Sequence, residues 1–474
     1  MSAIERCDIL ILGSGEAGKY LAWTLAKAGR RTAVVERGLI GGSCPNIACL
    51  PSKNVIYSAR VASLCRRGPE FGITTGPLSL DMKGVRQRKR KMVEDLVAVH
   101  RDRYERSGTE LIIGEGRFVA PKTLEVRLKD GGTRLLAGER AFLDVGTRAA
   151  IPDIPGLFQS QPLTHIEALE LDYIPDHLIV LGGGYVGLEF AQCMRRFGSR
   201  VTVVEQGPQL APHEDSDVAH GLLQLFQDED IEVVLNAHAL DVAGLSGEGI
   251  RMRVRTSQGT QTIEGSDLLA AAGRVPNTQG IGLDTAGIDL DARGYIKVNE
   301  RLETTAPDVW AMGDCAGSPQ FTHVAFDDFR IVRDNLNGGR RSTRDRLVPY
   351  CVFTDPELAR VGLNETEAQR SAIAYRVAKI PMAAVLRVRT VSESRGFLKA
   401  LLDAHSDRIL GFTAFGMDAG ELIAVLQTAM LCGAPYTTLR DAILTHPTIA
   451  EALTVLFASE PSAPIQGQQR VERA

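Results

Sequence analysis

The sequence lacks any run of about 20 apolar residues, so no segment suits a membrane span. It also lacks an excess of basic charge: the formal net charge is -4, which argues against a dedicated nucleic-acid binder. The N-terminal residues do not show a basic segment followed by an apolar one, the pattern of a secretion signal. We therefore expect a cytoplasmic protein with neither a membrane nor a nucleic acid as partner.

Cysteine is scarce, and its distribution argues against two kinds of site. Eight cysteines in 474 residues are too few for a disulfide scaffold. Cys44 and Cys49 form a close pair, which in a reducing compartment suggests metal binding or catalysis. Zinc is a poor interpretation because no second Cys or His pair stands at ligand spacing, so no metal site is expected. The other cysteines are isolated and are expected to be small buried apolar residues: Cys7, Cys65, Cys193, Cys315, Cys351 and Cys432.

The length and the glycine content point to several domains with ligand-binding turns. A chain of 474 residues is too long for one core and suggests roughly three domains. Hydrophobic residues at 44% and charged residues at 24% are ordinary for a globular protein. The 47 glycines indicate tight turns or close approaches between backbone and ligand.

A strand–turn–helix–strand pattern begins near the N-terminus. Residues 7–12 read as a buried parallel strand, 20–28 as a helix, and 32–35 as a second strand that ends at Glu36. The turn between the first strand and the helix has glycines at the spacing G-x-G-x-x-G, namely Gly13, Gly15 and Gly18.

The same pattern returns downstream in the same register. The strands are expected at 177–181 and 201–204, and the second ends at Glu205. The offset from the first glycine to the strand-end acid is 23 residues in both copies. One such motif is weak evidence, whereas two in this context are strong. The glycines of the second turn are Gly182, Gly184 and Gly187.

Both turns suit a dinucleotide. The first glycine permits the tight turn, the second lets backbone N–H groups approach a pyrophosphate, and the third lets helix and strand pack closely. The helix N-terminus adds partial positive charge for the phosphates. Glu36 and Glu205 would each accept hydrogen bonds from an adenosine ribose. The alternative is a pair of glycine-rich turns without ligand.

The segment Gly41–Lys53 holds the cysteine pair, whose members are five residues apart. On a regular helix they would point about 140° apart, so a bond between them needs a distorted turn. Such a short loop gains little chain-entropy stabilisation, and a strained short-loop disulfide is easily reduced. These features favour a redox bond, and two unbonded core thiols are the alternative.

The rest of the chain indicates a third strand-end acid and a separate domain. Residues 309–317 read as a strand ending at Gly-Asp314, where an acid could hold a polar sugar-alcohol chain or serve as a turn aspartate. The pattern of expected elements changes from Val348 onward, with a strand candidate at 396–402 and an apolar helix at 422–431. We read this part as an α+β domain.

Together these motifs resemble the class I pyridine nucleotide–disulfide oxidoreductases, the family of dihydrolipoamide dehydrogenase, glutathione reductase and mercuric reductase. The resemblance extends to about residue 458, and its most specific parts are Gly41–Lys53, both glycine turns, Val145–Thr147, Gly313–Asp314 and His446–Glu451.

The resemblance implies an α/β fold with two Rossmann-like dinucleotide-binding domains, for FAD and for NAD, and a C-terminal α+β dimerisation domain. The implied segments are an FAD domain at 1–149, an NAD(P) domain at 150–274, a return segment to the FAD domain at 275–346, and the dimerisation domain at 347–474.

The resemblance also implies roles for the site residues. Cys49 would be the charge-transfer thiolate beside the flavin and Cys44 the interchange thiol. Lys53 and Glu189 would form an ion pair beside the flavin, and Tyr185 would be a gate over it. The cofactor-binding residues would be Gly13, Gly15, Gly18, Glu36, Gly42, Ser43, Gly146, Thr147, Asp314, Gly182, Gly184, Tyr185, Gly187, Glu205 and Gly273.

His446 and Glu451 match the family's acid/base dyad. A departing thiolate must be protonated, and a His held by a carboxylate can do this near neutral pH. In the family this His reaches the partner subunit's site, so a homodimer with a shared active site is implied.

The expected activity is dihydrolipoamide dehydrogenase-like: electrons pass from NADH through FAD to the Cys44–Cys49 disulfide, then to a small-molecule or protein-bound disulfide. NADH is favoured over NADPH because Glu205 repels a 2′-phosphate. Mercuric reductases usually carry a vicinal cysteine pair at the C-terminus. Residues 456–474 contain no cysteine, so the resemblance disfavours genuine mercuric ion reduction. The alternatives are a metal or quinone reductase, an NADH oxidase, and a cofactor-stabilised scaffold protein.

Overall fold

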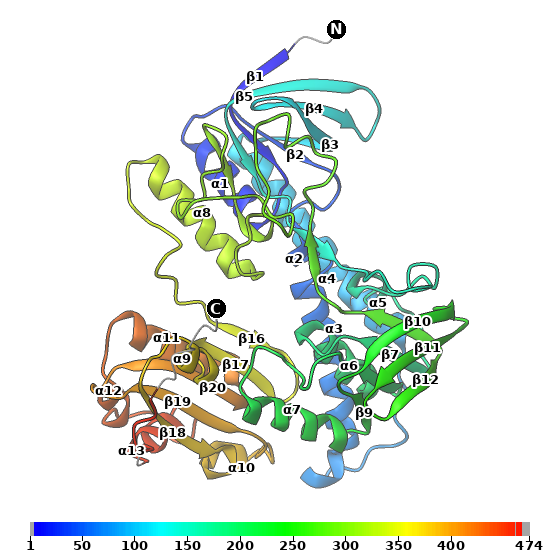
Figure 1. Cartoon of the computed structure of the whole chain (residues 1–474), viewed down its shortest axis with the longest axis vertical. Helices are drawn as coiled ribbons and strands as arrows, with labels where there is room; N and C mark the ends of the chain where they lie inside the picture. Colours follow the sequence, from blue (N-terminus) through cyan, green and yellow to red (C-terminus); the bar gives the residue numbers. More distant parts are fainter. Residues whose placement is uncertain (1–3, 460, 467–474) are drawn as a thin grey trace, which may run out of the picture.

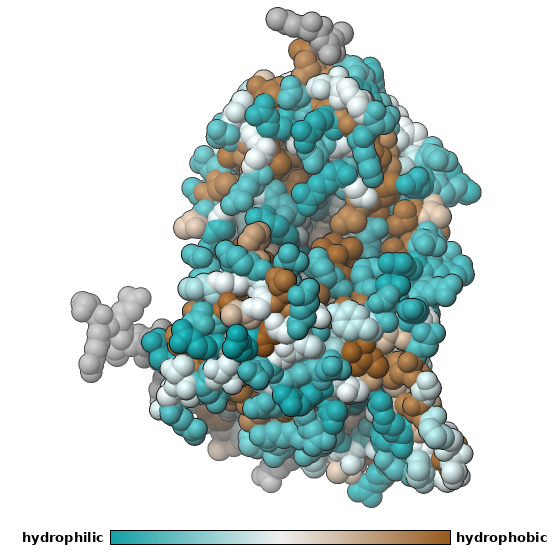
Figure 2. Space-filling model, turned by 90° about the vertical axis from the view of Figure 1, so that its right-hand side faces the viewer, coloured by the Kyte–Doolittle hydropathy of each residue, from teal (hydrophilic) through white to brown (hydrophobic). Residues whose placement is uncertain are grey.

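The computed structural model describes residues 4–459 and 461–466, and the last residues of the expected dimerisation domain lie outside this range. Figure 1 shows an upper lobe made of early (blue to cyan) and later (yellow-green) parts of the chain, a green lobe at the lower right, and a C-terminal lobe, yellow to red, at the lower left. On the face drawn in Figure 2, hydrophilic side chains predominate and surround scattered apolar patches. Within the described residues, no helix is both long enough and apolar enough to cross a membrane.

The upper lobe contains a six-stranded sheet. Its centre is β1 (Ile4–Leu12), which pairs in parallel with β2 (Thr32–Glu36) and β5 (Thr133–Leu143). The late strand β15 (Val309–Ala311) pairs in parallel with β5, which returns the chain to this lobe. The other elements here are β3 (Glu110–Ala120), β4 (Thr123–Leu128), α1 (Glu16–Lys27), the 3-10 turn η2 (Gly313–Ala316) and α8 (Thr322–Leu336).

The lower right lobe is built on a parallel sheet with the strand order β13-β7-β8-β9. Strands β13, β7 and β8 are almost entirely buried, as expected for a parallel sheet covered on both faces, whereas β9 is less buried. An antiparallel three-stranded sheet packs against this parallel sheet. The chain enters and leaves through an antiparallel pair, β6 (Thr147–Ala149) and β14 (Arg274–Pro276). The elements are α5 (His165–Ala168), β7 (His177–Leu181), α6 (Tyr185–Phe197), β8 (Arg200–Val204), α7 (Ser216–Asp228), β9 (Ile231–Val234), β10 (His238–Leu245), β11 (Gly249–Thr256), β12 (Gly259–Gly265) and β13 (Asp267–Ala270).

The C-terminal lobe is an antiparallel five-stranded sheet with the order β16-β17-β20-β19-β18. Its apolar core includes the helix predicted over 422–431, which begins earlier, at Ala419. The elements are β16 (Tyr350–Val352), β17 (Glu357–Gly362), α9 (Glu365–Arg370), β18 (Tyr375–Pro381), η3 (Met382–Ala384), α10 (Leu386–Arg389), β19 (Phe397–Asp403), β20 (Ile409–Gly416), α11 (Ala419–Leu431), α12 (Tyr436–Arg440) and α13 (Ala452–Ala458).

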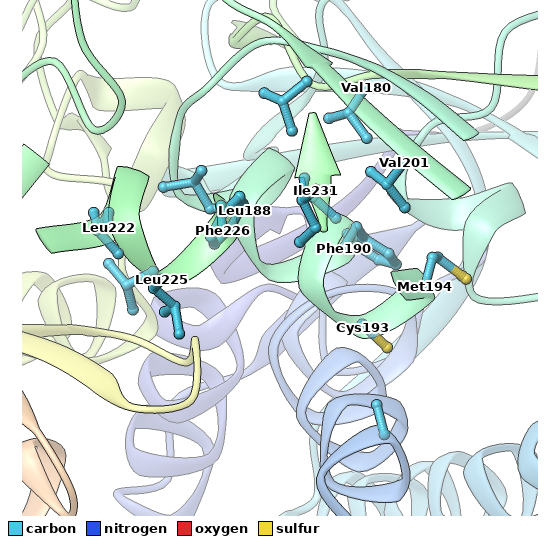
Figure 3. Close-up of a cluster of buried hydrophobic side chains, with 14 of the residues drawn as sticks. Val180, Leu188, Phe190, Cys193, Met194, Val201, Leu222, Leu225, Phe226 and Ile231 are labelled. Atoms are coloured by element: carbon cyan, nitrogen blue, oxygen red, sulfur yellow. The ribbon is translucent and has the colours of Figure 1, made fainter. Parts of the chain in front are cut away.

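Four further helical elements lie near the boundary of the lobes: α2 (Ser43–Asn46), α3 (Cys49–Arg66), η1 (Gly68–Phe71) and α4 (Met82–Ser107). The largest apolar cluster joins α3, through Val55 and Ala59, to the buried face of α6 and its sheet. Figure 3 shows the α6 side of this cluster, with Leu188, Phe190 and Cys193 packed beside strands β7 to β9. This core fixes α3 against α6. The expected fold class, two dinucleotide-binding α/β units and a C-terminal α+β domain, is confirmed.

Candidate active site

Cys44 and Cys49 lie on either side of a break between two helices. Cys44 is in α2, Cys49 begins α3, and Ala48 between them has φ -131° and ψ -104°, far from helical values. The distorted turn that the spacing predicts is therefore present. Both thiols are free and half-buried.

The surroundings of the pair place the proton on one sulfur. A hydrogen bond from the Cys44 thiol, the Thr322 hydroxyl and the Lys53 ammonium together lower the pKa of Cys49 to about 6, against the opposing effect of burial. The Cys49 Sγ lies 3.3 Å from Thr322 Oγ1. The same hydrogen bond, together with burial, raises the pKa of Cys44. Near neutral pH the arrangement thus favours a Cys49 thiolate beside a Cys44 thiol.

The expected ion pair one turn along α3 is in place. Lys53 Nζ lies 2.7 Å from Glu189 Oε2, so it joins α3 to α6. The other oxygen of Glu189 accepts a 2.9 Å hydrogen bond from the Phe353 amide of the C-terminal lobe. The Phe353 ring lies 4.8 Å from Lys53 Nζ. Three lobes therefore meet at this pair, whose carboxylate is buried.

The first glycine turn leaves no room for side chains. Gly13 has φ +98°, and a Cβ built on it would lie 2.3 Å from the Asp144 carbonyl oxygen. A Cβ on Gly42 would lie 2.7 Å from Gly15 Cα, so the two turns that carry these glycines touch through backbone. Glu36 is buried at the end of β2, and its carboxylate accepts hydrogen bonds from the backbone amides of Ser14, Gly38 and Leu39.

The second glycine turn repeats this arrangement. Gly182 has φ +115°, and a Cβ on it would lie 2.5 Å from the Ala271 carbonyl oxygen. A Cβ on Gly187 would lie 2.2 Å from the Gly182 carbonyl oxygen, the close helix–strand packing that the third glycine permits. Glu205 accepts hydrogen bonds from the amides of Gly183 at 2.7 Å and Gly207 at 2.6 Å.

The third strand-end acid, Asp314, lies in the turn after β15. Its Oδ2 accepts a 2.6 Å hydrogen bond from Thr147 Oγ1, and the Arg274 side chain donates to the same hydroxyl at 2.8 Å. Burial raises the pKa of Asp314. Gly146, with φ +63°, and Gly273, with φ +114°, stand beside the crossing strands β6 and β14 with open space around them.

Tyr185, the expected gate, belongs to a network that crosses between lobes. Its hydroxyl donates to Glu214 Oε1 at 2.6 Å, and the Tyr350 hydroxyl of β16 donates to the same oxygen. The rings of Tyr185 and Tyr350 stack with centroids 5.6 Å apart, and Tyr350 stacks on Phe321 at 5.7 Å. Arg360 forms an ion pair with Glu214 at 3.3 Å.

Most of the expected site residues line one cavity of about 2930 Å³. It extends from the first glycine turn, past the cysteines, to Tyr185 at the second turn. The expected residues that line it are Gly13, Gly15, Glu36, Gly42, Ser43, Cys44, Cys49, Lys53, Gly146, Thr147, Tyr185, Glu189 and Asp314. Those that support the turns without lining it are Gly18, Gly182, Gly184, Gly187, Glu205 and Gly273.

His446 and Glu451 form their expected pair but lie apart from the cavity lining. His446 Nδ1 lies 2.9 Å from both carboxylate oxygens of Glu451, which orients Nδ1–H toward the acid and leaves Nε2 free. The imidazole is 61% exposed. The pair precedes α13, at the outer end of the C-terminal lobe (Figure 1). Within one chain, the dyad and the thiols are therefore not brought together.

Three residues of the site were not predicted from the sequence, and three cysteines are less buried than expected. Thr322, Glu214 and Tyr350 had no motif to mark them, since each acts through a partner more than 20 residues away. Cys432 is exposed and Cys65 and Cys351 are half-buried, so the expectation of six buried thiols is wrong for these three. Cys7, Cys193 and Cys315 are buried as expected.

Each glycine turn, together with the N-terminus of the helix that follows it, forms a cradle: the first at Gly13–Gly18 and the second at Gly182–Gly187. The two cradles fit the two dinucleotides. Helices α1 and α6 begin at the glycine N-caps Gly15 and Gly184, which have no side chain to cap their helices. In α1 the Gly18 amide donates to Asp144, and the other first-turn amides remain for phosphate oxygens. The cavity beside the first cradle is large enough for a flavin dinucleotide. Among the described residues, no group of three or more His, Cys, Asp or Glu could hold a metal ion.

Comparison with known proteins gives a consistent result. Residues 7–328 match the model of the family described as pyridine nucleotide-disulphide oxidoreductase, and 348–456 match the dimerisation domain of that family. The chain is 37% identical over 461 residues to the probable pyridine nucleotide-disulfide oxidoreductase RclA of Escherichia coli, covering 96% of this chain and 99% of the relative. It is 31% identical to a dihydrolipoamide dehydrogenase of Chaetomium thermophilum, covering 94% and 89%.

A solved structure agrees. The Cu(II) complex of the HOCl-induced flavoprotein disulfide reductase RclA from Escherichia coli superposes with a TM-score of 0.87 at 36% identity, covering 96% of this chain and 99% of that one. The chain therefore belongs to the pyridine nucleotide-disulphide oxidoreductase family and is an oxidoreductase whose cofactors are FAD and NAD.

Proposed function

We propose that this protein is an NADH-dependent disulfide reductase in which Cys44 and Cys49 cycle between dithiol and disulfide. FAD, when bound in the first cradle, would relay electrons from the nicotinamide cofactor to this pair. The observation that carries the proposal is the pair of free thiols at the break between α2 and α3, which lines the cavity together with the first glycine turn and the Lys53–Glu189 pair. The lowered pKa of Cys49 and the raised pKa of Cys44 are consistent with this role. We also propose a cytoplasmic location, since the described cysteines are free and protein thiols stay reduced in that compartment.

The residues of the chain account for the disulfide exchange. His446 takes the proton of the Cys44 thiol, and the Cys44 sulfur attacks one sulfur of the substrate disulfide. The departing thiolate takes the proton from His446. The Cys49 thiolate then attacks the Cys44 sulfur, the second substrate thiolate leaves and takes a proton from the solvent, and the Cys44–Cys49 disulfide forms. Two electrons and two protons thus convert one disulfide to two thiols.

The acid/base dyad would come from a second copy of the chain. Among the described residues, the exposed His446 Nε2 has no hydrogen-bond partner, and the match of 348–456 to a dimerisation domain supports a homodimer. In such a dimer each active site would combine the thiols of one subunit with the dyad of the other.

NADH is the proposed electron donor because the second cradle holds an acid where a 2′-phosphate would lie. Glu205 keeps its carboxylate at the end of β8, and the following residue, Gln206, supplies no cation. Nearby arginines that would suit a phosphate are engaged elsewhere: Arg195 and Arg196 with Glu229, and Arg200 with His177.

Two variants test the proposal. Cys44→Ser should let NADH bleach the flavin but abolish turnover of lipoamide, glutathione and protein disulfides, because the interchange sulfur is gone. Cys49→Ser should also remove the long-wavelength thiolate–flavin absorbance of the reduced enzyme. Disulfide turnover that survives Cys44→Ser would contradict the assignment. Equal kcat/KM for NADH and NADPH would contradict the donor preference.

Reduction of a thiophilic metal ion is the second candidate. It is favoured by one observation: the related RclA of Escherichia coli has been solved as a Cu(II) complex. Cu(II) turnover with NADH in the wild type and in Cys44→Ser separates the candidates. Turnover of the metal that is retained without the interchange thiol, with no disulfide turnover in the wild type, would favour this candidate.

A further inference from the structure

One buried carboxyl that the proposed function does not use lies inside the first cradle. Asp144 follows β5, and its amide donates to the Leu12 carbonyl at 2.9 Å. The residue is 6% exposed, and its Oδ2 accepts a 2.6 Å hydrogen bond from the amide of Gly18. Gly18 lies in the first turn of α1, whose free amides form the anion-binding end of the cradle. An acidic side chain therefore occupies part of a site built for an anion.

The carboxyl group fills the space between two turns. A Cβ on Gly15 would lie 2.6 Å from Asp144 Oδ2, and a Cβ on Gly313 would lie 3.0 Å from Oδ1. Asp144 also lines the cavity beside Gly13 and Gly15. Oδ2 is thus committed to the Gly18 amide, while Oδ1 lies between the glycine turn and the turn that carries Asp314.

The second cradle provides an internal reference. There the residue after the strand is Ala271, whose amide donates to the Leu181 carbonyl at 2.9 Å, as Asp144 does to Leu12. The carbonyl oxygens of both residues lie against the first glycine of their turns. A methyl group is sufficient at this position for the strand–turn–helix to form, so the acid is a feature of the first cradle alone.

The charges around Asp144 disfavour its ionised form. Burial, together with the acids facing this carboxyl group, Asp314, Asp328 and Glu16, raises the pKa of Asp144 to about 7, against the opposing effect of the Gly18 amide. The acids have partners of their own: Thr147 for Asp314, Arg346 for Asp328 and Lys19 for Glu16. Among the described residues, no cation lies within ion-pair distance of Asp144 itself.

We propose that Asp144 is a positioning residue that keeps a proton when the first cradle holds its dinucleotide and donates it to the diphosphate. The inference rests on the proposed assignment of FAD to this cradle. Oδ2 accepts from Gly18, and the proton on the other oxygen turns a repulsion between two anions into a hydrogen bond. Retention of FAD is then linked to pH through one identified group.

The direction of the pH effect on FAD binding follows because FAD binds the form of the protein in which Asp144 is protonated. Below a pH of about 7 the free protein already carries the proton, and binding is unaffected. Above it, binding must take up one proton, so the dissociation constant for FAD rises by up to about tenfold per pH unit. Asp144→Asn mimics the protonated acid, since its amide both accepts from Gly18 and donates.

The experiment dilutes the FAD-loaded enzyme at pH values from about 6 to about 9 and follows the fluorescence of released FAD. The wild type should release FAD increasingly with pH, while Asp144→Asn should hold it with little pH dependence. Asp144→Ala, which copies Ala271, should bind more weakly than Asp144→Asn and also lose the dependence. Circular dichroism of each variant checks its fold independently of activity.

The outcomes separate the inference from the proposed function. The same pH dependence in the wild type and Asp144→Asn, or loss of FAD from a folded Asp144→Asn at every pH, would overturn the role of Asp144 while leaving the reductase assignment intact. A wild-type protein that binds no FAD at any pH would overturn the proposed function itself.

Discussion

At the scale of single residues, the cysteine pair divides one proton unequally. Cys49 has three groups that favour its thiolate, namely Cys44, Thr322 and Lys53, and they outweigh its burial. Cys49 is a thiolate without the help of a base, so it can attack the Cys44 sulfur in the second step of the exchange. Cys44 is a thiol, so a base must take its proton before it can attack a substrate. The need for a base at Cys44 is the reason that the dyad matters.

The pKa of Cys49 should be measurable in the reduced enzyme. Because its pKa is lowered to about 6, the thiolate should persist above that pH and become protonated below it. Alkylation of Cys49 by iodoacetamide, followed by mass spectrometry across pH, should show this midpoint. Thr322→Val removes one donor to the sulfur and should move the midpoint upward. A wild-type midpoint near that of an ordinary thiol would contradict the arrangement.

The Lys53–Glu189 pair should contribute to stability as well as to the site. Lys53→Met leaves the Glu189 carboxylate buried with only the Phe353 amide as partner, which should lower the free energy of unfolding by about 1–3 kcal/mol. Urea unfolding of the FAD-free protein measures the change. The double variant Lys53→Met/Glu189→Gln should recover part of the loss. An additive, larger loss in the double variant would show that the ion pair is not the cause.

At the scale of elements, the second glycine turn and β16 are tied together through Glu214. Tyr185 at the start of α6 is bonded to this buried acid and stacked on Tyr350. If Tyr185 is the gate, its displacement by the nicotinamide must break the bond to Glu214. The C-terminal lobe, through Tyr350 and Arg360, therefore takes part in holding the gate closed.

Tyr185→Phe tests this tether. The variant keeps the ring and its stacking but removes the hydroxyl that donates to Glu214, a bond worth about 1 kcal/mol. The KM for NADH should fall by roughly fivefold, since a weaker tether opens more easily, with kcat for a disulfide substrate nearly unchanged. Tyr185→Ala is the control for loss of the ring. An unchanged KM in Tyr185→Phe would show that the hydroxyl does not hold the gate.

The elements that could be predicted from the sequence are those whose cause is local. Both strand–turn–helix units, the strand-end acids and the break between Cys44 and Cys49 follow from spacing over a few residues. Thr322, Glu214 and Tyr350 could not be predicted, because their importance arises only when distant segments meet. The burial of Cys432 was predicted wrongly for a related reason. This residue follows the apolar helix α11 at an end that is exposed, and the neighbouring sequence does not indicate which end of a helix is buried.

At the scale of the whole molecule, the proposed acid/base dyad stands apart from the thiols of its own chain. The first glycine turn, the thiols, Lys53–Glu189 and Tyr185 lie around a common cavity, to which the C-terminal lobe also contributes lining residues. His446 belongs to that lobe but does not line the cavity, and its imidazole is 61% exposed. The exposed His446 imidazole is available to a second surface, as the proposed shared site requires. The motif HPTIAE could be assigned from sequence, but only the fold shows that His446 does not line the cavity that holds the thiols of its own chain.

Hybrid dimers test whether the sites are shared. Cys44→Ser and His446→Gln homodimers should each have greatly reduced disulfide turnover, because every site lacks one of the two groups. Random exchange of subunits makes half of the dimers hybrids, and each hybrid has one site with both Cys44 and His446. Activity should therefore recover to about a quarter of the wild-type value. If each site used the His446 of its own chain, no mixture could recover activity, since no subunit would carry both groups. Mixing without recovery, with subunit exchange verified by native mass spectrometry, would place the dyad in its own subunit's site.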